Sequence, residues 1–395
     1  TGLSRPLAGV DQFAAFTERA VLDARSQKDR RTWPETTVVA IDVPSGLCAD
    51  AGRYLESGTH AGRHVPVMAH LTVTFHTLKT GHVQEEAPQR CGTVVVVDIG
   101  LPAGGPANGV RSARVDVEAL GKGLPHKYSY GHALVLSGGV GHGGAARLAA
   151  RGALRVGAGL VTVGAPPAAL IENAAQLNAV MLKRVADPEV LGTVLEDARI
   201  NALCLGPGMG VTARTREMVL TALGSGRSCV LDADALTVFA EAPEVLFDAL
   251  HADCVLTPHG GEFARLFPDI AATLAAPATS GPAYSKVDAT RAAAARAGCV
   301  VLYKGADTVI AGPEGRCAIN AAQYARAAPW LATAGSGDVL AGFIAGLLAR
   351  GSDPFEAAET AAWLHVACAR SFGPGLIAED LPEQIPQVFK ALGLS

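Results

Sequence analysis

The stretch 332-ATAGSGDVLAGFIAGLLARG-351 joins a run of small residues to an apolar segment of helical character. Gly335, Ser336 and Gly337 come directly before a single carboxylate, Asp338. Glycines allow backbone N–H groups to converge on an anion because no Cβ stands in the way. The N-terminus of the following helix adds its dipole and its unpaired N–H donors. The stretch therefore predicts a phosphate site at the start of a buried helix.

Asp338 falls in the first turn of that helix, beside the predicted phosphate. A carboxylate there does not bind phosphate, because like charges repel, but it can take the proton from a hydroxyl that attacks phosphorus. The competing interpretation is that Asp338 only caps the helix and complements its dipole. Gly-rich turns before helices are frequent, so this motif alone favours neither interpretation.

The composition of the 395 residues indicates a folded α/β protein of two or three domains. Hydrophobic residues make up 49% and charged residues 18%, which allows a large core and argues against disorder. The 45 glycines suit many tight strand-to-helix turns. A net charge of −4 gives no sign of a nucleic-acid surface, so we expect no nucleic-acid partner.

The cysteines and the apolar runs point to the cytoplasm. Eight Cys residues are scattered without a CxxC pair, which favours buried free thiols over disulfides or zinc. The longest apolar runs, such as residues 339–349, are too short to cross a bilayer, and no signal-peptide pattern opens the chain. Because the first residue is Thr, we expect either processing or a longer parent protein.

Hydrophobic periodicity predicts two parts joined by a linker: residues 1–105, a Gly- and Pro-rich linker over 106–125, and residues 126–395. In the first part a helix is expected over 10–25. The strands expected there lie at 36–42, 71–77 and 93–100.

In the second part, strands alternate with apolar helical segments, and the remainder of the chain is predicted to be helical. Strands are expected at 132–138, 159–165, 201–206, 228–233, 253–258 and 299–305, followed by a hairpin of 307–312 and 316–320. Short strands with long crossovers predict a doubly wound, mostly parallel sheet with helices on both faces. Such sheets bind ligands at the carboxyl ends of their strands.

Polar motifs follow these predicted strands. In 304-KGADT-308, Lys304, Gly305 and Thr308 suit a nucleotide phosphate, although by itself an ordinary turn into the hairpin is slightly favoured. In 256-LTPHGGEF-263, His259 and Glu262 are expected to face the same region. The competing interpretations are that His259 is an ordinary polar loop residue and that Glu262 only complements the helix dipole.

Three further motifs also follow strands. In 231-LDADAL-236, Asp232 and Asp234 could hold Mg²⁺ through water or cap the next helix. The turn 205-LGPGMG-210 suits close approach of backbone to a ligand, or is scaffolding. The Gly-rich turn 137-SGGVGHGGAA-146 follows a strand and precedes a helix, and a Rossmann dinucleotide-binding fingerprint is its competing interpretation. The chain contains no P-loop motif. Each motif is weak alone; their joint placement predicts one cleft.

Together these motifs resemble the NAD(P)H-hydrate dehydratases of the ribokinase-like superfamily over residues 126–395. The matching stretches are HK…YG at 126–131, GGAARLAARGALRVGAGLVTV at 143–163, GPGMG at 206–210, LDADAL at 231–236, LTPHGGEFARL at 256–266, KGADTVIAGPEG at 304–315 and LATAGSGDVLAGFIAGLLARG at 331–351. The departures are Gly260 in place of the usual Pro, HKYSYG in place of HKGDYG, and a longer connector over 321–330.

The resemblance implies a repair reaction in which water is removed from the S-form of hydrated NADH or NADPH with ADP, or ATP, as co-substrate, giving AMP and phosphate. It implies Asp338 as the catalytic base. The residues that it assigns to the nucleotide are Lys304, Gly305, Ala306, Asp307, Thr308 and Gly337. The anion hole is assigned to Gly335, Ser336 and Gly337, and the hydrated cofactor to Ala146, Gly208, His259 and Asp338. It implies Mg²⁺ without identifying its ligands.

The N-terminal part resembles the second half of an NAD(P)H-hydrate epimerase domain, which has a Rossmann-like α/β fold. The markers are 1-TGLSRPLAG-9, 40-AIDVPSGLCADAG-52 and 71-LTVTFHTLKTG-81. The resemblance implies substrate binding by Asp42 and K⁺ binding by Ser45. The family's Asn-Asn-Gly-Gly-Asp loop does not occur here, so we expect either a fragment of a bifunctional protein or a truncated, inactive epimerase half.

Two other functions remain as alternatives. A small-molecule kinase of the same superfamily would leave a stable phosphorylated product. A scaffold without activity would bind nucleotide but not turn it over, which the intact Asp338 and Lys304 argue against. The expected partners are the small molecules NAD(P)H hydrate and ADP, with no membrane, and we expect a homo-oligomer.

Overall fold

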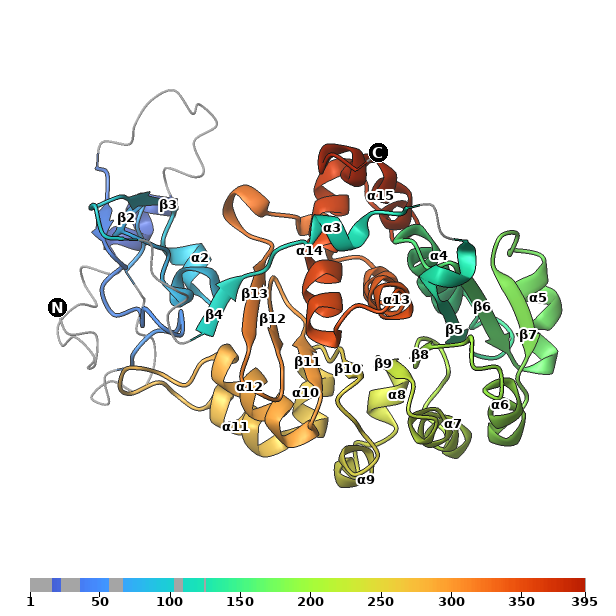
Figure 1. Cartoon of the computed structure of the whole chain (residues 1–395). Coiled ribbons are helices and arrows are strands. Elements are labelled where there is room, and N and C mark those ends of the chain that lie inside the picture. The colour runs from blue at the N-terminus through green and yellow to red at the C-terminus, as the bar shows by residue number, and fades with distance from the viewer. Residues whose placement is uncertain (1–15, 23–35, 57–66, 103–108, 124–125, 395) are drawn as a thin grey trace. The chain divides into compact units, whose positions relative to one another are not determined.

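A ten-stranded sheet dominates the structure, a computed structural model that describes residues 16–22, 36–56, 67–102, 109–123 and 126–394 (Figure 1). Its strands, in sheet order, are β4 (Val110–Ser112), β13 (Cys317–Ala321), β12 (Asp307–Ala311), β11 (Val300–Tyr303), β10 (Cys254–Leu256), β9 (Ser228–Leu231), β8 (Ala202–Leu205), β5 (His132–Leu136), β6 (Leu160–Ala165) and β7 (Met181–Arg184). The strands from β11 to β7 are parallel, and β12 is antiparallel to both of its neighbours.

Helices cover both faces of this sheet (Figure 1). Figure 1 shows α4 (Gly144–Arg155), α13 (Ser336–Ala349) and α14 (Pro354–Phe372) on one side and α6 (Pro188–Val194), α7 (Ala213–Gly224) and α10 (Gly260–Leu266) on the other. The remaining helices are α3 (Val117–Leu120), α5 (Leu170–Ala174), α8 (Asp234–Thr237), α9 (Pro243–Phe247), α11 (Pro268–Ala275), α12 (Lys286–Ala297) and α15 (Asp380–Ala391). The predicted doubly wound, mostly parallel sheet is thus confirmed.

The strand order reverses between β5 and β8. From β5 the chain continues to β6 and β7 on one side, and then returns to place β8, β9 and β10 on the other. The connections that follow β5 and β8 therefore lead to helices on opposite faces of the sheet, α4 and α7. Doubly wound sheets bind ligands at the carboxyl ends of such strands. A Cβ on Gly138 would lie 1.8 Å from the carbonyl oxygen of Gly208, so the two loops touch at this point.

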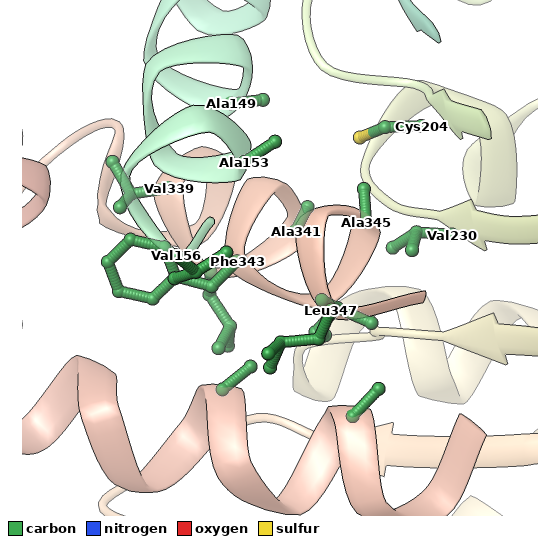
Figure 2. Packing of buried hydrophobic residues seen from close by; sticks show 14 of the residues in the cluster. Ala149, Ala153, Val156, Cys204, Val230, Val339, Ala341, Phe343, Ala345 and Leu347 are labelled. Carbon is green, nitrogen blue, oxygen red and sulfur yellow. The ribbon is translucent and has the colours of Figure 1, made fainter. Parts of the chain in front are cut away.

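The helix α13 packs against α4 through glycines. A Cβ on Gly342 would lie 2.1 Å from the carbonyl oxygen of Ala149, and one on Gly346 would lie 2.6 Å from that of Ala153. Figure 2 shows Ala149 and Ala153 of α4 facing α13, whose residues 339–349 are all buried. The backbones of the two helices approach closely because neither position carries a side chain.

The chain divides into two compact units. The small unit comprises Thr1–Val110, Ala271–Ala289 and Gln323–Ala325; the large unit comprises Arg111–Ile270, Thr290–Ala322 and Arg326–Ser395. Within the small unit, β1 (Val39–Ile41), β2 (Leu71–Phe75) and β3 (Thr93–Val97) form a parallel sheet. The short helices η1 (Thr80–Val83) and α2 (Ala87–Arg90) lie between β2 and β3 in the sequence.

Segments from far along the sequence complete the small unit. The Arg53 guanidinium donates to the carbonyl oxygens of Ala276 and Tyr284, and the N–H of Glu56 donates to the carbonyl oxygen of Ala278 at 2.7 Å. The hydroxyl of Tyr324 donates to the carbonyl oxygen of His82 at 2.7 Å. The small unit therefore uses residues that lie within the stretch 126–395.

The predicted strands are found, with ends shifted by one to three residues, and the hairpin is formed by β12 and β13. Two strands were not predicted, β7 and β4, and β4 and α3 lie inside the predicted linker 106–125. Of the predicted helix 10–25, the structure describes residues 16–22, which are helical; the marker 1-TGLSRPLAG-9 lies outside the described residues. All eight cysteines are buried and free. No helix in the described ranges is long and apolar enough to cross a membrane.

Candidate active site

The N-terminus of α13 begins with a left-handed residue. Gly335 has φ 86°, and a Cβ there would lie 2.8 Å from Leu148 Cδ1 and 2.9 Å from Ala378 Cβ. Both the backbone conformation and the space require glycine at this position. Ser336 opens the helix, and its hydroxyl donates to the carbonyl oxygen of Leu331 at 2.9 Å. Its N–H points to the carbonyl oxygen of Thr333 at 3.4 Å, a long contact.

Asp338 lies in the first turn of α13, as predicted, and is partly buried. Burial is the main cause that raises the pKa of its carboxyl to about 6, and the carboxylate of Asp232 adds to the effect. The ammonium of Lys304 acts in the opposite direction. A carboxylate with this pKa is ionised at neutral pH and is a stronger base than an ordinary aspartate.

Lys304 follows β11 and pairs with Asp232, which follows β9. Its Nζ lies 2.6 Å from Asp232 Oδ1 and 3.8 Å from Glu262 Oε2. Burial lowers the pKa of Lys304, but the carboxylates of Asp232 and Glu262 outweigh it and raise the pKa overall. A Cβ on Gly337 would lie 3.6 Å from this Nζ, so the lysine stands beside the start of α13.

A cavity of about 340 Å³ opens at this place in the large unit. The residues that line it include Lys304, Gly305, Ala306, Thr308, Ser336 and Gly337. Thr308 folds the 304–308 turn onto itself, since its hydroxyl donates to the carbonyl oxygen of Gly305 at 2.7 Å. The structure thus brings most of the residues predicted for the nucleotide and for the anion hole to one cavity.

The residues predicted for the hydrated cofactor are spread more widely. Gly208 has φ 70°, and a Cβ there would lie 2.6 Å from the carbonyl oxygen of His142, so its turn packs on the loop after β5. His259 caps α10, accepting from the N–H of Gly261 at 2.9 Å, and the Glu262 carboxylate accepts from the N–H of His259 at 2.8 Å. Ala146 is fully buried in α4, so its side chain belongs to the core.

His365 belongs to this site and was not predicted. It lies on α14, lines the same cavity, and its Nε2 is 2.8 Å from the carbonyl oxygen of Ser336. Its position in the middle of an apolar helix gives no local signal in the sequence. Its contact with Ser336 exists only because α14 packs on α13.

The described residues supply carboxylates for a cation but no ready-made cage. In these ranges no three His, Cys, Asp or Glu side chains gather closely enough to hold a metal by themselves. Asp232 is paired with Lys304, and Asp234 accepts from the N–H of Gly210 at 2.8 Å. Mg²⁺ is commonly held by one or two carboxylates, water and substrate phosphates, and this donor set fits that kind of site.

The model of the family described as NAD(P)H-hydrate dehydratase matches residues 133–387, which is more than half of the chain. The chain belongs to the NAD(P)H-hydrate dehydratase family. A second model, described as the YjeF-related protein N-terminus, matches residues 1–81.

Similar proteins are described as bifunctional enzymes. The chain is 34% identical to the bifunctional NAD(P)H-hydrate repair enzyme of Salinibacter ruber over 89% of its own length and 65% of that protein's. It is 36% identical to the enzyme of the same description from Moorella thermoacetica over 90% of its own length and 67% of that protein's. The chain therefore spans about two thirds of the length of these relatives.

Solved structures match the large sheet and its helices. An ADP/ATP-dependent NAD(P)H-hydrate dehydratase of Bacillus subtilis, crystallised with ATP and Mg²⁺, is 29% identical with a TM-score of 0.54, over 68% of this chain and 92% of that one. A ribokinase-like superfamily protein of Enterococcus faecalis has a TM-score of 0.59 at 21% identity, over 73% of this chain and 99% of that one, and shows the fold alone. The fold is ribokinase-like, and the comparisons support the dehydratase over the kinase alternative.

The residues predicted for an epimerase function lie in the small unit. Asp42 follows β1 with φ 66°, accepts from the Thr74 hydroxyl at 2.7 Å and pairs with Lys79 at 3.2 Å. Burial raises the pKa of Asp42, but the hydrogen bonds from Thr74 and Lys79 outweigh it, so the pKa is lowered overall. Ser45 is exposed in the turn that follows.

Proposed function

We propose that this chain dehydrates the S-form of NADH or NADPH hydrate with ADP as co-substrate, giving NADH or NADPH, AMP and phosphate. The observation that carries the proposal is that Lys304 and Gly337 line the cavity of the large unit, and that the charge of Lys304 acts on the carboxylate of Asp338. Phosphoryl transfer needs a base, a positive charge and donors for the phosphate, and these groups would supply them.

Asp338 acts as the base. It takes the proton of the hydrate hydroxyl while that oxygen forms a bond to the terminal phosphorus of ADP and AMP leaves. The C–O bond then breaks, phosphate departs with the bonding electron pair, the adjacent ring carbon loses a proton to solvent, and the ring double bond returns. The raised pKa of Asp338 suits the first step, because a carboxylate of higher pKa holds the transferred proton better.

Lys304 and the N-terminus of α13 would stabilise the negative charge of the transferring phosphoryl group. The first N–H groups of a helix have no acceptor within it, and the helix dipole favours an anion there. Lys304 Nζ stands beside Gly337 and adds a full positive charge. Preorganised donors of this kind stabilise charge that develops in the transition state.

Mg²⁺ is part of the proposal. Asp232 and Asp234 would help to hold it, and it would neutralise phosphate charge. Asp232 and Asp234 both act electrostatically on Asp338, so the site carries acidic charge that a cation would balance. Parallel assays with ADP and with ATP would show which nucleotide supports the faster dehydration.

We also propose that the small unit contributes to epimerisation of the R- and S-hydrates in a protein that carries a whole epimerase domain. Asp42 then contacts substrate and Ser45 binds K⁺. A cytoplasmic location and a homo-oligomeric state complete the proposal. Sedimentation would test the oligomer, and an epimerisation assay with and without K⁺ would test the small unit.

The test of the main function uses purified chain, chemically prepared S-NADH hydrate, Mg²⁺, and ADP or ATP in parallel. We expect the absorbance of the reduced nicotinamide ring to return, with AMP and phosphate formed in equal amounts when ADP is supplied. A stable phosphorylated product would instead indicate a kinase. Nucleotide binding without any turnover would indicate a scaffold, and either result would overturn the proposal.

A further inference from the structure

The buried side chain of Asn320 lines the nucleotide cavity. Asn320 lies on β13 directly opposite Thr308 of β12, and only 3% of it is exposed. Thr308 belongs to the predicted nucleotide run, so a cross-strand neighbour of that run also contacts the cavity. Asn320 was not among the predicted site residues.

One hydrogen bond fixes which way the amide of Asn320 points. Its Nδ2 donates to the carbonyl oxygen of Ala362 on α14 at 2.7 Å. Since a carbonyl oxygen only accepts, the NH₂ group must face Ala362, and Oδ1 must face the other way. Exchanging the two atoms would set two acceptors against each other.

The second half of the amide has no partner in the described part of the chain. Oδ1 of Asn320 is buried and accepts no hydrogen bond there. A buried acceptor without a donor is costly, and most such groups in native proteins are satisfied. Because Asn320 lines the cavity and its NH₂ group is held in place, its remaining acceptor is suited to a ligand that carries a donor.

The surroundings of Asn320 indicate the kind of donor. The cavity is largely apolar near it, with Ala322, Leu331, Leu340 and Val366 in its walls. Lys304 and Gly337 supply the groups for phosphate. A flat heteroaromatic base fits an apolar slot, and specific polar groups in such slots fix orientation and choice of ligand.

We propose that Asn320 Oδ1 accepts a hydrogen bond from the exocyclic amino group of the nucleotide base and makes the site selective for amino-bearing bases such as adenine. This inference rests on the proposed function, since it assumes that the cavity takes ADP. Hypoxanthine carries a carbonyl where adenine carries the amino group, so IDP would bring an acceptor against Oδ1. A ribose hydroxyl is the other donor that a nucleotide offers, and the test separates the two.

The test measures binding of ADP, IDP and 2′-deoxy-ADP by calorimetry, with no turnover involved. For the wild-type chain we expect ADP to bind at least about tenfold more tightly than IDP and about as tightly as 2′-deoxy-ADP. Equal affinities for ADP and IDP would overturn the inference and leave the proposed function standing. A loss of affinity confined to 2′-deoxy-ADP would assign Oδ1 to the ribose and overturn it as well. If none of the nucleotides binds, the proposed function fails too.

The variant Asn320→Leu removes the acceptor and keeps the volume of the side chain. We expect its affinity for ADP to fall by about tenfold and its preference over IDP to disappear, with IDP binding unchanged. An unchanged preference would contradict the inference. The melting temperature and circular dichroism check that the variant is folded. Asn320→Asp keeps an acceptor on the side away from Ala362 but sets a second one against the Ala362 carbonyl, so it should retain the preference for ADP over IDP with a lower melting temperature. The wild-type comparison decides the matter if neither variant folds.

Discussion

The imidazole of His365 fixes the carbonyl of Ser336, with Nε2 and the oxygen 2.8 Å apart. Burial lowers the pKa of His365 to about 4, so the ring is neutral at physiological pH. Because the carbonyl only accepts, Nε2 carries the proton and donates it. The Ser336 C=O and the Gly337 N–H belong to one planar trans peptide and point in opposite directions. His365 therefore sets the direction of the Gly337 N–H, the group that we propose meets the phosphate.

Replacement of His365 by Leu should lower kcat by about tenfold and change the KM for ADP much less, because the peptide loses its orientation in the transition state. The variant His365→Gln, whose amide N–H can donate to the same carbonyl, should recover most of the rate. Steady-state kinetics of both variants check this. If both lose kcat and melting temperature equally, His365 is only a packing residue.

Replacement of Asp338 by Asn should lower kcat by about 10²–10⁴-fold, because the amide cannot take the hydroxyl proton. ADP binding should stay within a few-fold of the wild-type value, as the nucleotide groups are unchanged. Single-turnover rates and calorimetric binding measure the two effects separately. Substantial turnover by Asp338→Asn would show that another group is the base.

The pH dependence of kcat should report the ionisation of Asp338. Since the ionised carboxylate is the proposed base, kcat should rise with pH and level off above the pKa of Asp338, which is about 6 before the substrates bind. The positive charge of Lys304 lowers the pKa of Asp338 and the negative charge of Asp234 raises it. The midpoint should therefore move up in Lys304→Met and down in Asp234→Asn, measured at saturating ADP. Shifts in the same direction in both variants would contradict the assignment.

Replacement of Gly342 by Ala should destabilise the large unit by about 3 kcal/mol, because the new Cβ would stand 2.1 Å from the carbonyl oxygen of Ala149. Two helix backbones must separate to admit it. The matched control is Gly192→Ala in α6, where a Cβ meets nothing within 4 Å. That change should leave stability equal or raise it by up to about 1 kcal/mol. Denaturant unfolding compares the two variants.

Most of the sheet could be predicted because its strands are short apolar runs that end in Gly or polar residues. The strand β7 was not predicted because 181-MLKR-184 is a mostly exposed edge strand with two positive charges and no alternation of apolar and polar residues. The base, the lysine and the glycine turn were predicted because each follows a strand or opens a helix.

The rest of the site depends on packing between distant segments. Asn320 ends a predicted strand, but its role depends on Ala362, which lies 42 residues further along. His365 depends in the same way on Ser336, 29 residues before it. No local pattern in a single sequence reveals such pairs of residues.

The close contact between α4 and α13 also fixes the position of Asp338. Gly342 and Gly346 hold α13 at one height and one rotation against α4. One residue added between Asp338 and Gly342 would turn the carboxylate by about 100° and shift it by about 1.5 Å along the axis. It would then face away from Lys304. Changes in chain length should therefore be tolerated before Gly335 or after Gly351, and not in the three residues between Asp338 and Gly342.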